Sequence, residues 1–231
     1  MGLLKSSIWL WDRMAVGPTF QSVIAGPSEA VDPDVHREKA CPTYFFNRPT
    51  VRNEPPIVTE QVTIRGETPG DYEPIAVVNR RAFGQEEEGL LIAKLRGSDG
   101  FDPSLSLVGE IAGDVVGHIL FSPIHIETER GDVPALALAP MAVLPNFQKR
   151  GIGSQLVRTG LDISRQAGHA IVVVLGHPDY YPRFGFQQAS RFGVRSPIDV
   201  PDDAFMVQGL IPGALDAVMG VVRYPGAFDG V

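Results

Sequence analysis

The segment 135–175 constrains the fold of this chain more than any other. An almost wholly apolar run, Ala135–Leu144, predicts a buried strand, and apolar spacing in Gly151–Ala167 predicts an amphipathic helix after it. The β-branched run Ala170–Leu175 predicts a second buried strand. Because a helix joins the two strands, they are expected to run parallel in one sheet. Pro140 cannot donate to a sheet ladder, so a bulge or a broken pairing is predicted there.

The remaining periodic signals predict two helices and several strands. Thr68-Pro69-Gly70-Asp71 has the composition of a helix start, and Glu86-Glu87-Glu88 would place negative charge on the first turn of a second helix. The apolar face of that second helix is assigned to Leu90, Leu91 and Leu95. Further strands are predicted at Ile57–Val58 with Val62–Ile64, 104–112, 115–127, 205–210 and 221–224, and a short helix or turn at 178–184.

The proline distribution divides the chain. Residues 1–56 hold seven of the 20 prolines and show no clean period, so we predict an extended or disordered N-terminal arm. Aromatic residues in this segment leave open an arm that docks on the body or on a partner. The folded domain is predicted to span residues 57–225, followed by a C-terminal tail, 226–231.

Charge and cysteine content exclude several classes. A net charge of −7 and a pI near 5.2 argue against nucleic-acid partners, which favour a basic surface. No apolar run is long enough to span a membrane, so no membrane association is expected. The single cysteine, Cys41, suits a reducing compartment and a cytoplasmic location. His169 and His177 do not have metal-ligand spacing, and no metal is expected.

The start of the helix after the first buried strand predicts an anion site. Gly151 and Gly153 would let a phosphate approach free main-chain amides, and Lys149 and Arg150 add positive charge. A dinucleotide fingerprint would need a small residue where Leu156 stands, and the chain has no Gly-Lys-Ser/Thr loop. The sequence therefore favours a phosphate or pyrophosphate site of another kind.

Three motifs carry a family resemblance. Gln148-Lys149-Arg150-Gly151-Ile152-Gly153 matches the Q/R-x-x-G-x-G/A acetyl-CoA loop of the GNAT superfamily of N-acetyltransferases, and Leu138-Ala139-Pro140-Met141-Ala142-Val143 resembles its bulged fourth strand. Tyr181-Pro182-Arg183-Phe184-Gly185-Phe186 matches its Y-x-x-x-G-F signature. The similarity covers about residues 57–225. Within it, Gly117–Pro123 and Pro212–Leu215 resemble the YhbS-like branch.

The resemblance implies a mixed α/β, GNAT-like fold and a co-substrate, acetyl-CoA. The central sheet would be mixed but mostly antiparallel, splayed between its fourth and fifth strands, with helices on both faces. Main-chain groups of Met141, Ala142 and Val143 would hold the pantetheine arm. The pyrophosphate would bind at the loop and helix start, formed by Gln148, Lys149, Arg150, Gly151, Ile152, Gly153 and Ser154.

The resemblance also implies a reaction. An acetyl group would pass directly to a primary amine in a ternary complex, and Tyr181 matches the general acid, although the adjacent Tyr180 could exchange roles with it. The fourth strand, Ala135–Leu144, has no titratable side chain, so the general base is not assigned. The candidates are a water chain and the side chains of His118, Ser122, His125 and Glu127. The acceptor is a small-molecule or protein amine, and a homodimer is compatible with this fold. The alternative function is an acyl-CoA-binding sensor or regulatory module with weak or no turnover.

Overall fold

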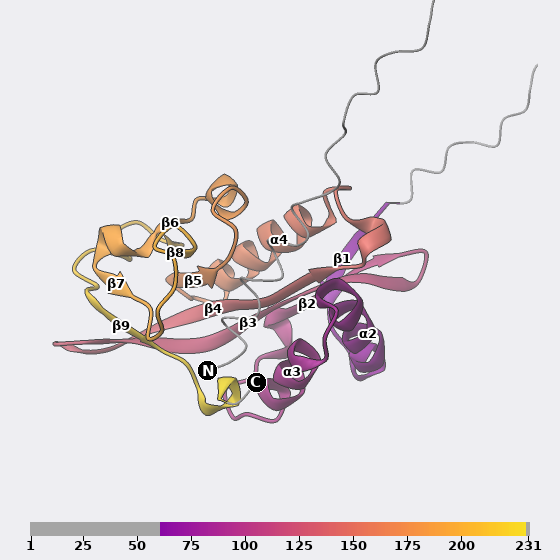
Figure 1. Cartoon of the computed structure of the whole chain (residues 1–231), viewed down its shortest axis with the longest axis horizontal. Coiled ribbons are helices and arrows are strands. Elements are labelled where there is room, and N and C mark those ends of the chain that lie inside the picture. The colour runs from indigo at the N-terminus through magenta and orange to yellow at the C-terminus, as the bar shows by residue number, and fades with distance from the viewer. Residues whose placement is uncertain (1–60, 230–231) are drawn as a thin grey trace, which may run out of the picture. The chain divides into compact units, whose positions relative to one another are not determined.

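The structure is a computed structural model that describes residues 61–229. The predicted N-terminal arm and the predicted strand residues Ile57–Val58 lie outside the described residues. The described residues form one mixed sheet with helices on both faces, as expected (Figure 1).

Nine strands make up this sheet in the described part of the chain. They are β1 (Thr63–Gly66), β2 (Ser106–Ile111), β3 (Asp114–Thr128), β4 (Gly131–Val143), β5 (Ile171–Leu175), β6 (Gln187–Gln188), β7 (Val194–Arg195), β8 (Phe205–Gly209) and β9 (Gly220–Arg223). The main path runs β1-β2-β3-β4-β5-β8-β6, and β9 pairs with both β3 and β7. Only the β4–β5 and β7–β9 pairs are parallel, so the sheet is mixed and mostly antiparallel, as predicted. The two-residue strands β6 and β7 were not predicted, because so short a run has no measurable period.

Within residues 61–229, three α-helices cover the sheet. Figure 1 shows α4 (Ile152–Gln166) on one face, and α2 (Tyr72–Phe83) and α3 (Glu87–Arg96) on the other. Alternation along the strands explains how both faces are filled. Ile119 and Phe121 of β3 belong to the cluster beneath α4, whereas Leu120, between them, packs with α2 and α3.

The first helical segment begins where the sequence predicts. Pro69–Asp71 forms one turn of 3-10 helix that leads directly into α2. The Thr68 amide donates to Asp71 Oδ2 over 2.7 Å, and Asp71 also pairs with Arg65 of β1. These contacts satisfy an otherwise free amide at the helix start and attach it to the sheet.

The predicted face of α3 is corrected at two positions. Leu90, assigned to the apolar face, is 56% exposed, and Glu88 is buried instead. The buried set is Glu88, Leu91, Ile92 and Leu95, which follows the i, i+3, i+4, i+7 spacing of one helix face. Of the three adjacent glutamates, Glu86 and Glu87 are therefore exposed to solvent and Glu88 is not.

The parallel β4–β5 pairing stops halfway along β4. Its last register pair is Leu138 with Val174. On the other side of β4, the antiparallel register with β3 shifts, so that Ala139 and Pro140 stand opposite the single residue Leu120. This shift confirms the bulge predicted from Pro140. Beyond it, β4 remains paired with β3 but no longer with β5, and the sheet is splayed at that point.

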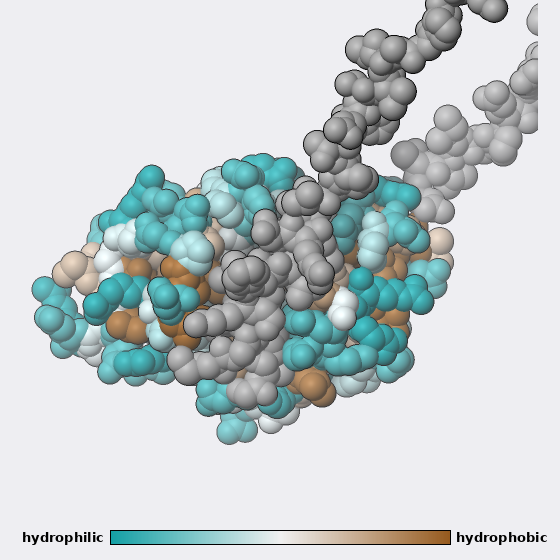
Figure 2. All heavy atoms as spheres, viewed as in Figure 1, coloured by the Kyte–Doolittle hydropathy of each residue, from teal (hydrophilic) through white to brown (hydrophobic). Residues whose placement is uncertain are grey.

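The folded domain extends past residue 225, the boundary predicted from the sequence. Phe228, in a short 3-10 turn, is buried and packs in the cluster that holds α3. Within 61–229, no helix has the length and apolar character needed to cross a bilayer. Figure 2 shows a mostly hydrophilic surface on the visible face, with smaller apolar areas.

Candidate active site

The loop between β4 and α4 presents main-chain donors at one point. Lys149 has φ of 62° and Gly151 has φ of 85°, so two left-handed residues alternate just before the helix. Such an alternation turns successive amides toward one side and makes an anion-binding concavity. Gln155 is the first residue whose amide bonds back, to the Gly151 carbonyl at 3.0 Å. The amides of Ile152, Gly153 and Ser154 precede it and have no carbonyl of the helix to accept them.

The predicted strand residues lie next to this helix start. A Cβ built on Gly153 would lie 3.5 Å from Met141 Sδ and 3.7 Å from Val143 Cγ2, so the end of β4 faces the first turn of α4. The Gln148 side chain donates to the Val143 carbonyl over 3.0 Å and ties the loop to the strand. Ala142 lies between them with its side chain buried among α2 residues on the opposite face. The pantetheine and pyrophosphate residues predicted separately are thus adjacent in space.

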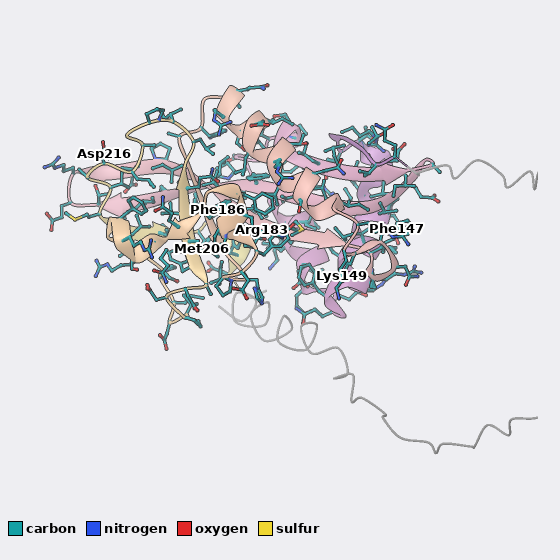
Figure 3. The ribbon with its side chains drawn as sticks, turned by 90° about the horizontal axis from the view of Figure 1, so that it is seen from above. Phe147, Lys149, Arg183, Phe186, Met206 and Asp216 are labelled. Carbon is teal, nitrogen blue, oxygen red and sulfur yellow. The ribbon has the colours of Figure 1, made fainter. Side chains whose placement is uncertain are left out.

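Positive side chains surround the loop. Lys149 and Arg150 are exposed, and the Arg150 guanidinium lies 5.0 Å from the ring centre of Phe147. Arg183 lies 4.4 Å from the ring centre of Tyr180, on the segment after β5. Figure 3 shows Arg183 between Phe186 and the loop that carries Phe147 and Lys149. These cations make the region around the helix start locally positive, although the protein as a whole is acidic.

A cavity of about 70 Å³ opens where β4 and β5 separate. Its lining includes the bulge residues Ala139 and Pro140, the next residue Met141, and two residues of β5. Across from them lie side chains from α3 and from the C-terminal segment. The full set of lining residues is Phe83, Glu88, Leu91, Ala137, Leu138, Ala139, Pro140, Met141, Val173, Leu175, Tyr181, Tyr224 and Phe228.

Tyr181 lines this cavity and is held firmly by its neighbours. The ring stands edge-on to Phe186, with ring centres 5.6 Å apart, and a Cβ on Gly176 would lie 2.2 Å from it. Burial, with a smaller contribution from neighbouring Tyr180, raises the pKa of the Tyr181 phenol well above its ordinary value. The group therefore stays protonated at neutral pH and is able to donate.

Tyr180 occupies a different place from its neighbour. Its hydroxyl lies at the start of α4, where it forms a hydrogen bond with Ser154, and burial raises the pKa of this phenol as well. Only Tyr181 of this pair lines the cavity. The structure therefore separates the two tyrosines between the helix start and the cavity, a distinction that adjacent positions in the sequence do not make.

Glu88 is the acidic side chain in the lining, and sequence reasoning missed it. It is 1% exposed, and the Gln85 side chain donates to its Oε1 over 2.9 Å. The signal was present, because Glu88 precedes Leu91, Ile92 and Leu95 by three, four and seven residues. That spacing places a carboxylate on the buried face of α3.

The four side chains proposed as bases from the sequence lie outside the cavity lining. His118 is fully buried between Ser106, at 3.0 Å, and Asn79, at 3.4 Å. Burial first, and the nearby Arg96 second, lower the pKa of His118 to about 3. Ser122 is buried on the same face of β3, and His125 and Glu127 pair with Asp132 and Arg223 near the far end of the β3–β4 hairpin.

The network around His118 connects both helices to the sheet. Arg96 of α3 binds Glu67 through two hydrogen bonds of 2.9 and 2.7 Å, and the Ser106 hydroxyl donates to Glu67 over 2.6 Å. Each of these residues is buried or nearly so and has at least one hydrogen-bond partner, although the buried Oδ1 of Asn79 has none among the described residues. We interpret the network as structural, because it anchors the elements on which Glu88 and the cavity wall stand.

A bulged strand that parts from its parallel neighbour, followed by a helix start that presents free amides, is the arrangement of the GNAT acetyltransferase fold. The sequence model of the Acetyltransferase (GNAT) domain matches residues 63–189, and the chain belongs to this family. The confirmed family agrees with the resemblance noted in the sequence motifs.

Curated relatives and solved structures agree with this placement. The chain is 38% identical over 167 residues to the uncharacterized N-acetyltransferase YhbS of Escherichia coli K12, covering 72% of this chain and 98% of YhbS. It is 39% identical over 144 residues to the uncharacterized N-acetyltransferase YjhQ of the same organism, covering 61% of this chain and 80% of YjhQ. The crystal structure of E. coli YhbS in complex with CoA superposes with a TM-score of 0.67 and 36% identity, covering 72% of this chain and 91% of YhbS. The crystal structure of a GNAT family acetyltransferase from Brucella melitensis in complex with acetyl-CoA superposes with a TM-score of 0.61 and 35% identity, covering 74% of this chain and 99% of that one.

Proposed function

We propose that this protein is an acetyl-CoA-dependent N-acetyltransferase that transfers the acetyl group directly to a primary amine in a ternary complex. The observation that carries the proposal is the position of Tyr181, a protonated phenol in the cavity where β4 leaves β5. The same opening lies beside the donors at the start of α4. Solved relatives in complex with CoA and with acetyl-CoA support the choice of co-substrate.

The residues that would hold acetyl-CoA are those predicted from the motifs. The unpaired edge of β4 at Met141, Ala142 and Val143 offers main-chain groups to the pantetheine amides, as a neighbouring strand would. The loop and first turn, 148–154, offer amides and positive side chains to the pyrophosphate. Ser154 is additionally joined to Tyr180. This assignment stays a prediction until a complex is determined.

The proposed chemistry needs one new bond and one broken bond. The lone pair of the amine nitrogen attacks the thioester carbon, the C–N bond forms, and the C–S bond breaks with its electrons on sulfur. Tyr181 gives its proton to the departing thiolate. Because the ordinary pKa of a thiol, near 8.5, is below that of a phenol, near 10, this transfer depends on the positioned contact and on the return of a proton to the phenol. A proton from the newly acylated nitrogen then restores the phenol. The enzyme contributes mainly position and proton transfer.

We further propose that the acceptor is a cationic amine and that the reaction takes place in the cytoplasm. The net charge of −7 would attract cations by its field, although that field alone selects no molecule. The acceptor could be a small molecule or a protein amine, and a homodimer is compatible with the family. We propose no nucleic-acid partner and no membrane association.

The test is thiol release with acetyl-CoA and a broad panel of primary amines, with the acetylated product identified by mass spectrometry. We expect amine-dependent release of CoA. Tight acetyl-CoA binding without any amine-dependent turnover would instead favour the sensor or regulatory module. That alternative is supported by one observation, namely that the stretch of β4 from Ala135 to Val143 has no carboxylate.

A further inference from the structure

The proposed reaction leaves the amine without a binding group, and the cavity supplies one. Amines are mostly protonated at neutral pH, so an acceptor arrives as an ammonium ion that must be held and then lose a proton. Glu88 is a buried acidic side chain in the cavity lining, on the first turn of α3. Negative charge is favoured at that end of a helix. It stands in the same lining as Tyr181 and the bulge of β4.

We propose that Glu88 receives the ammonium group of the acceptor and takes its proton, an inference that rests on the proposed function. The proton passes from nitrogen to the Glu88 carboxylate, which frees the lone pair that attacks the thioester carbon. Glu88 later returns this proton to solvent, and Tyr181 supplies the proton for the thiolate. The Gln85 side chain, 2.9 Å from Glu88 Oε1, orients the carboxylate as a positioning residue.

The remaining lining narrows the class of acceptor. Apart from Glu88 and the two phenols Tyr181 and Tyr224, the described lining residues are apolar, and none is cationic. A carboxylate on the amine-bearing carbon would therefore enter beside Glu88 without a positive partner, which is unfavourable in a poorly solvated site. The acceptor end is thus a primary amine on a hydrocarbon chain, and not an α-amino acid.

The volume agrees with that assignment. About 70 Å³ is well above the ~10–15 Å³ that one water molecule needs, and it accommodates an ammonium group with the first carbons of a chain. Phe83, Leu91 and Phe228 line the cavity and would contact these carbons. The rest of the acceptor would extend out of the cavity.

The test measures ligand binding to the full chain saturated with CoA, by calorimetry, so that it does not depend on turnover. The probes are pentylamine, 1-pentanol, which lacks the charge, and norleucine, which has a carboxylate on the amine carbon. We expect pentylamine to bind at least tenfold more tightly than either analogue. Glu88→Gln keeps the size and the hydrogen bond to Gln85, and it should weaken pentylamine at least tenfold while leaving 1-pentanol unchanged.

Glu87→Gln is the matched control, because Glu87 is the exposed neighbour of Glu88 on the same helix turn. It should leave all three affinities unchanged, and CoA affinity should be equal in both variants if both fold. Equal effects of the two substitutions, no pentylamine binding by the wild type, or equal affinity for norleucine would each overturn the inference. Kinetic measurements distinguish a failure of this inference from a failure of the proposed function. Ammonium binding through Glu88 without acetylation would contradict only the proposed enzymatic function. Acetylation that is unaffected by Glu88→Gln would contradict only this inference.

Discussion

The hydroxyl of Tyr180 lies 2.9 Å from the position that a Cβ on Gly153 would occupy. The first turn of α4 therefore has no room for a side chain at residue 153 unless Tyr180 moves. Met141 and Val143 stand on the same side, so the absence of a side chain keeps the helix start, the end of β4 and Tyr180 in contact.

Gly153→Asp should abolish acetyl-CoA binding in a folded protein. The new carboxylate would displace the Tyr180 hydroxyl and place negative charge where the pyrophosphate is expected. Calorimetry with acetyl-CoA measures the effect, and circular dichroism checks the fold. Gly89→Asp is the control, since a Cβ there meets nothing within 4 Å and an acid suits the first turn of α3. Tight binding by the Gly153 variant would place the phosphate site elsewhere.

Tyr181→Phe should lower kcat by about 10²–10⁴-fold, the usual loss for a general acid. Acetyl-CoA affinity should change little, because the ring and its packing on Gly176 and Phe186 are kept. Because burial raises the pKa of the phenol, the wild-type rate should not fall through ionisation of Tyr181 in the mildly alkaline range. Steady-state kinetics over that range check both expectations.

Tyr180→Phe tests the separation of the two tyrosines. It removes the hydroxyl that contacts Ser154, so it should weaken acetyl-CoA binding and leave kcat nearly intact. Tyr72→Phe, at an exposed position on α2, is the neutral control. A larger loss of kcat in the Tyr180 variant than in the Tyr181 variant would exchange the two roles.

Gly160→Ala should destabilise the protein although alanine is the better helix former. A Cβ at residue 160 would meet the Phe121 ring at 2.2 Å, where α4 packs on β3. Overpacking of this kind typically costs about 1–3 kcal/mol, and the helix gains back roughly 1 kcal/mol, so the free energy of unfolding should fall by up to about 2 kcal/mol. Denaturant unfolding measures it.

The contrast for that substitution is Gly89→Ala. Open space at Gly89 predicts a gain of about 0.5–1 kcal/mol from helix propensity alone. Adding Phe121→Leu to Gly160→Ala should recover part of the loss, since the clash is with the ring. A stabilised Gly160 variant would contradict the tight contact between α4 and β3.

Acidification should destabilise the protein through His118. Its folded pKa is about 3 against an ordinary value near 6.5, so between these values the unfolded chain binds the extra proton. Stability is therefore lost as pH falls from 6.5 toward 3, by up to about 1.4 kcal/mol per pH unit for this residue. Asp71, whose pKa is lowered mainly by its hydrogen bond with Arg65, adds a further loss below about pH 4.

Urea unfolding at pH about 5 and about 7, on either side of the ordinary histidine pKa, tests this expectation. His118→Gln keeps a polar group within reach of Ser106 and Asn79 and should flatten the pH dependence in that interval. An NMR titration gives an independent check, because the His118 ring should stay neutral throughout. Protonation of the ring near pH 6.5 in the folded protein would show that His118 is not buried in this hydrogen-bond network.

Local patterns accounted for most of the fold. Apolar spacing placed α4 and the strands around it, and Pro140 alone predicted the bulge that ends the β4–β5 pairing. The family resemblance carried the expectation of an acetyl-CoA loop at 148–154 and of Tyr181 as the general acid, and both remain predictions. These inferences succeed because each depends on residues close together in the chain, whose periodicity or backbone chemistry is legible without the rest of the molecule.

Only the tertiary structure decided which side chains share the cavity. Glu88, the bulge of β4, Tyr181 and Tyr224 are separated by tens of residues, and they meet because α3 and the C-terminal segment both pack beside the splay of the sheet. Tyr180 and Tyr181 are adjacent and chemically alike, yet the turn after β5 sends one to the helix start and the other to the cavity. In the sequence Glu88 is the last of three consecutive glutamates. Its spacing to the apolar residues of α3 places it on their face of the helix, but only the packed fold shows that this face lies beside the cavity, whereas Glu86 and Glu87 are exposed.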